Sequence, residues 1–147
     1  MIDIELRAAA LEDVAALVSM EAVLFSDAWS ASALASTLSS PFSVAFIAYA
    51  DGLAVGYWIA SLLSPEGELL RIGVHPAYRR RGIGALLMEK FLQTAKERGC
   101  TDLFLEVRAD NLPAASLYRR FGFSDNGLRR GYYKNPSADA LLMKRCD

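Results

Sequence analysis

Three consecutive arginines stand directly before two closely spaced glycines, and this group has the composition of an anion site. The residues are Arg79, Arg80, Arg81, Gly82 and Gly84. An apolar segment precedes them and an amphipathic pattern follows, which places the glycines at the start of a predicted helix. The first backbone N–H groups of a helix lack partners and carry partial positive charge. Since glycine has no side chain to cover these groups, the spacing predicts a phosphate or pyrophosphate site.

A plain solvated loop is the alternative for the same segment. A G-x-G at a helix start is a weak signal by itself, and runs of arginine are usually solvated. The segment has neither the lysine of a P-loop nor the third glycine of the dinucleotide fingerprint. Other residues must therefore decide whether a ligand binds here.

Two further side chains have the chemistry of a general base and a general acid. Glu106 interrupts the apolar run 103–107, and Tyr118 follows on a helix that Asn111 is placed to cap. Each has a structural alternative. Glu106 could face solvent or pair with Arg108, Tyr118 belongs to an apolar set at helical spacing that is typical of a core residue, and Asn111 could serve only as a helix cap.

The first half of the chain is predicted to form a strand, two helices and a meander of three antiparallel strands. Hydrophobic periodicity gives a strand over 2–7, a helix over 11–25 and a shorter helix that starts near Ser30 and ends at Leu38. The meander is predicted over 42–50, 53–63 and 68–74, with a tight hairpin turn at Asp51-Gly52.

The second half is predicted to begin with a crossover. A helix over 82–98 buries Ile83, Leu87, Phe91 and Ala95 on one face, and a strand over 101–107 follows. A strand, helix and strand in this order predict a right-handed parallel crossover. A helix over 111–121 and two last strands, one starting at 123 and one over 138–144, complete the chain.

Composition limits the possible functions. The chain has 147 residues, 53% of them hydrophobic, which fits one packed domain over 1–147. A net charge of −1 argues against general nucleic-acid binding. The single histidine, His75, and the widely separated Cys100 and Cys146 predict no metal site. No stretch has the pattern of a leader peptide or a membrane span, so we expect a cytoplasmic protein with no membrane partner.

The pattern Arg79-x-x-Gly82-x-Gly84 after an apolar strand resembles the acetyl-CoA motif of the GNAT (Gcn5-related) N-acetyltransferases. The predicted order βααβββαβαββ is also that of the GNAT fold, an α/β (α+β) fold around a mixed, mostly antiparallel sheet. The resemblance implies acetyl-CoA as co-substrate and no metal. It places the pyrophosphate on the loop and helix start, and the pantetheine arm along the preceding strand. The implied cofactor-binding residues are Ile72, Gly73, Val74, Arg79, Arg80, Arg81, Gly82, Ile83, Gly84 and Ala85.

The segments 105–111, 114–118, 121–123, 129–133 and 139–143 are similar to the RimI branch of this family. Members of that branch acetylate the N-terminal alanine of the eighteenth protein of the small ribosomal subunit. The resemblance implies that Glu106 is the general base, that Tyr118 protonates the departing CoA, and that Asn111 contacts the cofactor. We expect direct transfer in a ternary complex, because no cysteine or serine is placed as a nucleophile.

Other acceptors and one other class of protein stay open at this point. The acceptor could be a wider range of N-termini, a lysine or a small amine, and the chain could instead be a non-catalytic acyl-CoA-binding partner subunit. A single carboxylate base would be sufficient for an α-amine. The pKa of an α-amino group is roughly 7.7–8.0, so about a quarter of such groups are neutral near pH 7.4. We expect a protein N-terminus as partner, no direct nucleic-acid contact, and a monomer or weak dimer.

The first two helices are predicted to help form the acceptor groove, as they do in the GNAT family, although Phe25 and Trp29 could equally pack the helical hairpin. The acidic side chains nearby could attract a basic peptide, or could simply be solvated; these are Glu12, Asp13, Glu21 and Asp27. Gly73 stands where a larger residue would be ordinary.

Overall fold

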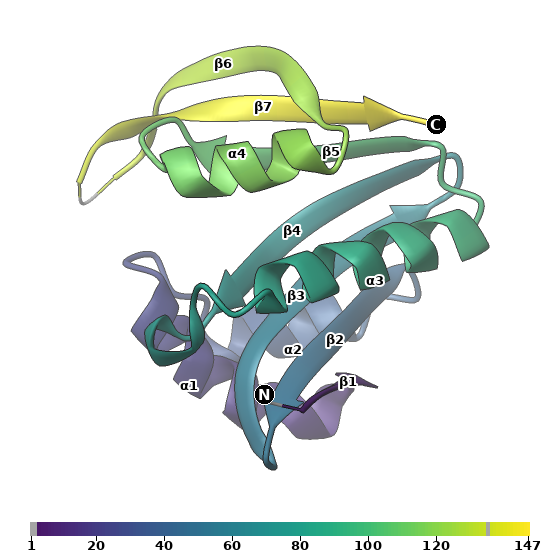
Figure 1. Cartoon of the computed structure of the whole chain (residues 1–147), viewed down its shortest axis with the longest axis vertical. Coiled ribbons are helices and arrows are strands. Elements are labelled where there is room, and N and C mark those ends of the chain that lie inside the picture. Colours follow the sequence, from purple (N-terminus) through teal and green to yellow (C-terminus); the bar gives the residue numbers. More distant parts are fainter. Residues whose placement is uncertain (1–2, 135) are drawn as a thin grey trace.

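A seven-stranded sheet forms the centre of the computed structural model, which describes residues 3–134 and 136–147. The strand order is β1-β2-β3-β4-β5-β7-β6 (Figure 1). Neighbours are antiparallel except β4 and β5, which are parallel. The predicted mixed, mostly antiparallel sheet is confirmed. The strands are β1 (Ile4–Ala8), β2 (Ser43–Ala50), β3 (Leu53–Leu63), β4 (Glu66–Val74), β5 (Asp102–Arg108), β6 (Ser124–Tyr133) and β7 (Ala138–Cys146).

Two helices cover each face of the sheet, and each face has its own apolar cluster. Packed on one face are α1 (Val14–Leu24) and α2 (Ala31–Leu38), where Leu17 and Leu34 meet side chains of β2 and β3. The other face is covered by α3 (Ile83–Glu97) and α4 (Leu112–Arg120), which lie in front of the sheet in Figure 1. Short 3₁₀ turns precede α1 (η1, Leu11–Asp13) and α3 (η2, Pro76–Tyr78).

Local signals in the sequence predicted several element ends correctly. The hydroxyl of Ser30 caps α2 by accepting a hydrogen bond from the Ala33 N–H at 3.1 Å. Both residues of the Asp51-Gly52 turn have positive φ, at 50° and 81°, as a tight hairpin requires. The predicted buried face of α3 is confirmed, because Ile83, Leu87, Phe91 and Ala95 are all buried.

The prediction for the first helix was wrong in its start. Residues 11–13 form the 3₁₀ turn η1, so the α-helix itself begins at Val14. The buried residues are Leu17, Met20 and Glu21, whereas Ala22 is exposed. Glu21, which was expected to attract a basic peptide or to be solvated, is therefore a core residue.

The sheet opens between β4 and β5, and this opening positions the candidate site. The two strands pair only from Glu66↔Asp102 to Leu69↔Leu105. Beyond these pairs β4 continues to Val74, while β5 continues beside β7, with Glu106 opposite Leu142. On the side of β4 that faces β5, the described residues 70–74 have no strand partner, so their backbone groups are available to a ligand.

Candidate active site

The start of α3 is an open cradle of backbone N–H groups. The first hydrogen bond of the helix runs from the Leu86 N–H to the Gly82 carbonyl at 3.1 Å, so the preceding N–H groups have no partner within the helix. Gly82 has φ +79°, and a Cβ placed on it would meet no heavy atom within 4 Å. A Cβ on Gly84 would meet only Leu117 Cδ2, at 3.4 Å. The cradle therefore has room for an anion, as a pyrophosphate site requires.

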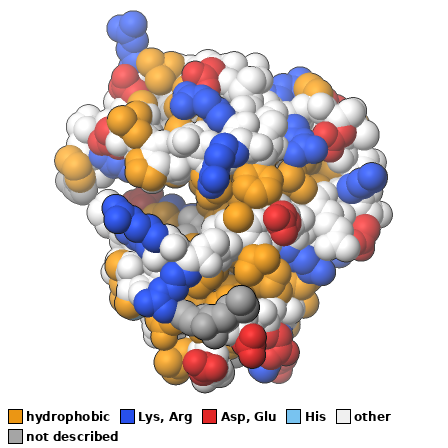
Figure 2. All heavy atoms as spheres, in the orientation of Figure 1, with side chains coloured by type: hydrophobic (Ala, Val, Ile, Leu, Met, Phe, Trp, Pro, Cys, Tyr) orange, Lys and Arg blue, Asp and Glu red, His pale blue; other side chains and the backbone are white. Residues whose placement is uncertain are grey.

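The three arginines before the cradle are exposed, and only the first is tied to the strand. The Nε–H of Arg79 donates to the Val74 carbonyl at 3.1 Å, which fixes the loop to the end of β4. Arg80 adopts φ +65°, and the Arg81 guanidinium lies 5.5 Å from the centre of the Tyr78 ring. Figure 2 shows a hollow on this face between the start of α3 and α4, with Lys or Arg side chains at its rim. Positive charge at this rim suits a phosphorylated ligand.

The three predicted residues of β4 divide between the two faces of the sheet. Ile72 and Val74 pack against the core under α3 and α4. Gly73 faces α1, where a Cβ would lie 2.7 Å from Leu24 Cδ1 and 3.5 Å from Phe25 Cζ. The glycine therefore lets the end of α1 approach β4 closely, and this accounts for a small residue at this position.

A carboxylate placed in the cradle should weaken binding of an anionic ligand. We expect Gly82→Asp to weaken acetyl-CoA binding by at least about 10-fold, because a negative charge at a helix start opposes a pyrophosphate there. Gly52→Asp is a matched control, since Gly52 also has positive φ (+81°) and open space for a Cβ. Isothermal titration of both variants measures the difference; equal affinities would argue against the cradle.

Glu106 projects from β5 toward the α1/α2 face of the sheet. Its neighbours Leu105 and Val107 are buried in the cluster under α3 and α4, and strand alternation directs Glu106 the other way. Its side chain is 28% exposed and lies 3.5 Å from Arg129 Nη2. Arg108 instead pairs with Asp110 at 3.1 Å, so the alternative of a Glu106–Arg108 pair is wrong. The carboxylate of Glu106 is thus accessible to a substrate.

A groove of about 600 Å³ runs along the sheet beside Glu106. It lies between the β3–β4 turn and β6, and its charged lining includes Glu66, Glu68, Glu106 and Arg129. Burial, and next the negative charge of Glu106, raise the pKa of Glu68. The groove therefore reaches the side chain of the candidate base.

Tyr118 and Asn111 are both engaged in the structure of α4. Tyr118 is 6% exposed and packs edge-on against Phe123, with ring centres 6.4 Å apart. Burial, and to a smaller extent Tyr133, raise its pKa, so the phenol stays protonated at neutral pH. Asn111 caps α4, since its Oδ1 accepts a hydrogen bond from the Ala114 N–H at 3.2 Å. Its amide nitrogen is still available as a donor.

Tyr133, at the end of β6, is a candidate that the analysis of the sequence did not single out. Burial, followed by the charge of Glu106, raises its pKa to about 12. The Arg108 guanidinium lies 5.4 Å from its ring centre. Tyr133 thus lies within electrostatic range of both Glu106 and Tyr118. Only its place in the segment 129–133 that resembles the RimI branch could have signalled this.

The buried tyrosines predict that the protein loses stability in alkali. The pKa of Tyr57, Tyr118 and Tyr133 is raised above the ordinary value of 10.0. Above pH 10 the unfolded chain releases these protons before the folded protein does. The contribution of the three tyrosines to the free energy of unfolding is therefore fully present below pH 10 and is lost as the pH rises toward 12. We expect the free energy of unfolding, measured by urea denaturation, to be constant from pH 8 to 9.5. At higher pH it should decline by up to about 1.4 kcal/mol per pH unit for each tyrosine. Tyr133→Phe should make the decline shallower, and an equally steep decline would contradict this assignment.

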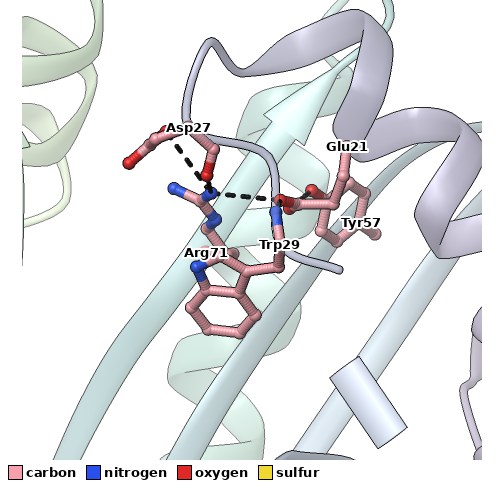
Figure 3. Close-up of polar contacts among 5 residues, drawn as sticks. All are labelled: Glu21, Asp27, Trp29, Tyr57 and Arg71. Carbon is pink, nitrogen blue, oxygen red and sulfur yellow. Dashed lines mark hydrogen bonds and ion pairs between the residues drawn. The ribbon is translucent and has the colours of Figure 1, made fainter. Parts of the chain in front are cut away.

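A second missed feature is a buried ion pair between α1 and β4 (Figure 3). Glu21 is fully buried and accepts hydrogen bonds from Arg71 Nη2 at 3.0 Å, from the Trp29 N–H at 2.7 Å, and from the Tyr57 hydroxyl. Arg71 also donates to the Asp27 carbonyl at 2.8 Å. The pair joins α1, β3, β4 and residues 25–30, and the amphipathic pattern of the first helix gave no sign of it.

Two common features do not occur among the described residues. Residues 3–134 and 136–147 contain no cluster of three or more His, Cys, Asp or Glu side chains that could hold a metal ion. In the same ranges, no helix has both the length and the apolar character needed to cross a membrane.

Comparisons with known proteins agree with this geometry. The family model of the acetyltransferase (GNAT) family matches residues 14–123. The N-alpha-acetyltransferase RimI of Mycobacterium tuberculosis is 42% identical over 139 residues, 90% of this chain and 86% of that protein. The [ribosomal protein bS18]-alanine N-acetyltransferase of Salmonella typhimurium is 36% identical over 96 residues, 64% of this chain and 65% of that protein. The crystal structure of the ribosomal-protein-S18-alanine N-acetyltransferase from Escherichia coli superposes with a TM-score of 0.91 at 29% identity, covering 98% of this chain and 94% of that one.

Proposed function

The chain belongs to the acetyltransferase (GNAT) family, and we propose that it transfers the acetyl group of acetyl-CoA to the N-terminal alanine of ribosomal protein bS18. The likeness over nearly the whole chain to enzymes named for this reaction carries the proposal. A ribosomal-protein acceptor also fits a cytoplasmic enzyme.

The residues at the start of α3 and the end of β4 suit the phosphates and the amide-containing arm of acetyl-CoA. The unpartnered N–H groups at the start of α3 would hold the pyrophosphate, with Arg79, Arg80 and Arg81 as the basic rim. The free backbone edge of residues 72–74 would pair with the amides of the pantetheine arm. Acetyl-CoA supplies the activated acetyl group, so the chain needs to provide only binding, orientation and proton transfer.

Glu106 and Tyr118 would perform the two proton transfers. Glu106 would take a proton from the acceptor α-amine, directly or through one water, as the nitrogen bonds to the acetyl carbon. Tyr118, held protonated by burial, would give its proton to the departing sulfur. Glu106 projects to the α1/α2 face of the sheet and Tyr118 lies under α4, so in this proposal the base and the acid would act from opposite faces of the sheet.

A pair of peptides tests the acceptor. We expect CoA release with acetyl-CoA and a peptide that begins Ala-Arg, measured by thiol titration. The same peptide with a blocked N-terminus and an internal lysine should give no release above background. Turnover of the blocked peptide would assign the enzyme to lysine. A lack of turnover with both, while acetyl-CoA still raises the melting temperature, would favour the non-catalytic binding subunit or another acceptor.

A further inference from the structure

Arg129 of β6 lies beside the proposed base in the groove along the sheet. Among the described residues that line this groove it is the one basic side chain, whereas three carboxylates line it, those of Glu66, Glu68 and Glu106. Arg129 Nη2 lies 3.5 Å from Glu106 Oε1. This distance exceeds the roughly 2.7–2.9 Å of a charge-assisted hydrogen bond. The guanidinium therefore acts on the carboxylate mainly through its charge.

An irregularity of β6 directly after Arg129 fixes the direction of this side chain. The register between β6 and β7 shifts between Arg129 and Tyr133. Within this segment Gly131 has φ +60°, and its N–H donates to the Asp139 carboxylate at 2.8 Å. The Arg129 guanidinium also lies 5.5 Å from the centre of the Tyr132 ring. Such bulges redirect side chains, and this one holds a cation beside Glu106.

Stability alone is a poor reason for this ion pair. The side chain of Arg129 is 55% exposed and that of Glu106 is 28% exposed. Exposed ion pairs contribute little to the free energy of unfolding, because water and salt screen the two charges. The effect of Arg129 on the charge of Glu106 is a different matter, since the carboxylate must be ionised to accept a proton.

The negative charges of the groove oppose ionisation of the base. Like charges in one site favour the protonated form of a carboxyl group. Burial, and next the charge of Glu106, raise the pKa of Glu68, while the charge of Arg129 lowers it. Arg129 thus acts on both carboxylates. A groove without this cation would leave the base protonated, and so inactive, over a wider range of acid pH.

The other cations on this face of the sheet are paired with other carboxylates. Arg71 pairs with Glu21 and Asp27, Arg108 with Asp110, and Lys144 with Asp102, at 3.0, 3.4, 3.1 and 3.9 Å. Tyr133 is neutral at working pH, because its pKa is raised to about 12, and the partner of Glu106 on β7 is the apolar Leu142. In the described part of the chain, Arg129 is therefore the cation assigned to Glu106.

We propose that Arg129 is a positioning residue for the reaction, whose guanidinium keeps the Glu106 carboxylate ionised in a groove that Glu66 and Glu68 make acidic. Glu68 acts in the opposite direction, so the two side chains together set the pH at which the base becomes active. The inference rests on the proposed function, because it takes Glu106 as the base.

The test compares pH profiles of kcat/KM for the Ala-Arg peptide in Arg129→Gln, Glu68→Gln and the double variant. These profiles report ionisations of the free enzyme and the free peptide, and the peptide amine titrates alike with every variant. Arg129→Gln should move the fall in rate at acid pH upward by about 0.5 to 1 pH unit, as expected for one charge at this distance in a solvated site. Glu68→Gln should move it to lower pH, and the double variant should lie near wild type. The kcat at the optimal pH should change little in all three.

Carbon-13 NMR of the Glu106 side-chain carboxyl follows the same ionisation without turnover. Its titration should shift in the same directions as the rate profiles. Arg129→Lys keeps the charge, so it should restore most of the wild-type behaviour. Arg7→Gln is the matched control, because Arg7 is an exposed cation that pairs with Glu5 at 3.0 Å on β1, at the opposite edge of the sheet. It should leave both titrations unchanged.

An unchanged acid fall in Arg129→Gln would overturn the inference, as would an equal shift in Arg7→Gln or shifts of the same sign in Arg129→Gln and Glu68→Gln. If the wild-type protein turns over neither peptide, the proposed function fails. The NMR titration then still decides by itself whether Arg129 controls the charge of Glu106.

Discussion

Glu106→Gln should lower kcat by about 10²- to 10⁴-fold, the range that a general base contributes, or about 3–5 kcal/mol of barrier. Glutamine keeps the size of the side chain but cannot accept the proton of the amine. The Kd for acetyl-CoA should stay within twofold, because the cradle at Gly82 and the edge of β4 are untouched. Steady-state kinetics with the Ala-Arg peptide and isothermal titration with acetyl-CoA measure the two effects.

Glu68→Gln is the matched control variant for this experiment. It is a glutamate of β4 in the same groove, and burial raises its pKa. If Glu106 is the base, Glu68→Gln should change kcat far less than Glu106→Gln does. A large loss in Glu68→Gln with normal turnover in Glu106→Gln would transfer the role of base to Glu68.

Tyr118→Phe should lower kcat by about 100-fold with little change in stability. The phenol is the proposed donor to the departing sulfur, and general acids contribute from about 10² upward. We expect the low end, because a thiol with a pKa near 8.5 is already a fair leaving group. Among the described residues no hydrogen bond to the Tyr118 hydroxyl occurs, so its removal should cost no more than about 0.5 kcal/mol.

Thermal melts and single-turnover kinetics separate the two roles of Tyr118. Tyr49→Phe is a suitable control, because Tyr49 lies on β2 beside Arg7, away from the opening in the sheet. It should leave the rate unchanged. A Tyr118→Phe variant with a lower melting temperature and a normal rate would identify Tyr118 as a core residue only.

Signals that act over a few residues were read correctly from the sequence. The cap at Ser30, the Asp51-Gly52 turn and the apolar face of α3 depend on neighbours within one or two turns, and all three were confirmed. The parallel pairing of β4 with β5 followed from the order of strand, helix and strand. The predicted cap at Asn111 was also confirmed, while its contact with the cofactor stays a prediction.

Features that depend on pairing between distant segments could not be read in this way. Glu21 looked like a solvated residue because its partner, Arg71, is 50 positions away in the sequence. The 3₁₀ turn over residues 11–13 moved the start of the helix to Val14, and its residue types do not distinguish it from a first helical turn. The candidate site also combines local and long-range features. The glycines of the cradle form a local motif that the sequence shows directly, whereas the position of Tyr133 near Glu106 depends on where β6 ends.

The opening between β4 and β5 narrows the link between the two halves of the sheet, while the apolar cluster under α3 and α4 spans both halves. Among residues 3–134 and 136–147, the strand pairs that link β1–β4 to β5–β7 run from Glu66↔Asp102 to Leu69↔Leu105. A molecule of acetyl-CoA between the strands would act as a cross-link, because it would touch both halves at once. Since a ligand at 100 times its Kd adds about 2.7 kcal/mol to the stability of the folded state, acetyl-CoA at such a concentration should raise the free energy of unfolding by about that amount.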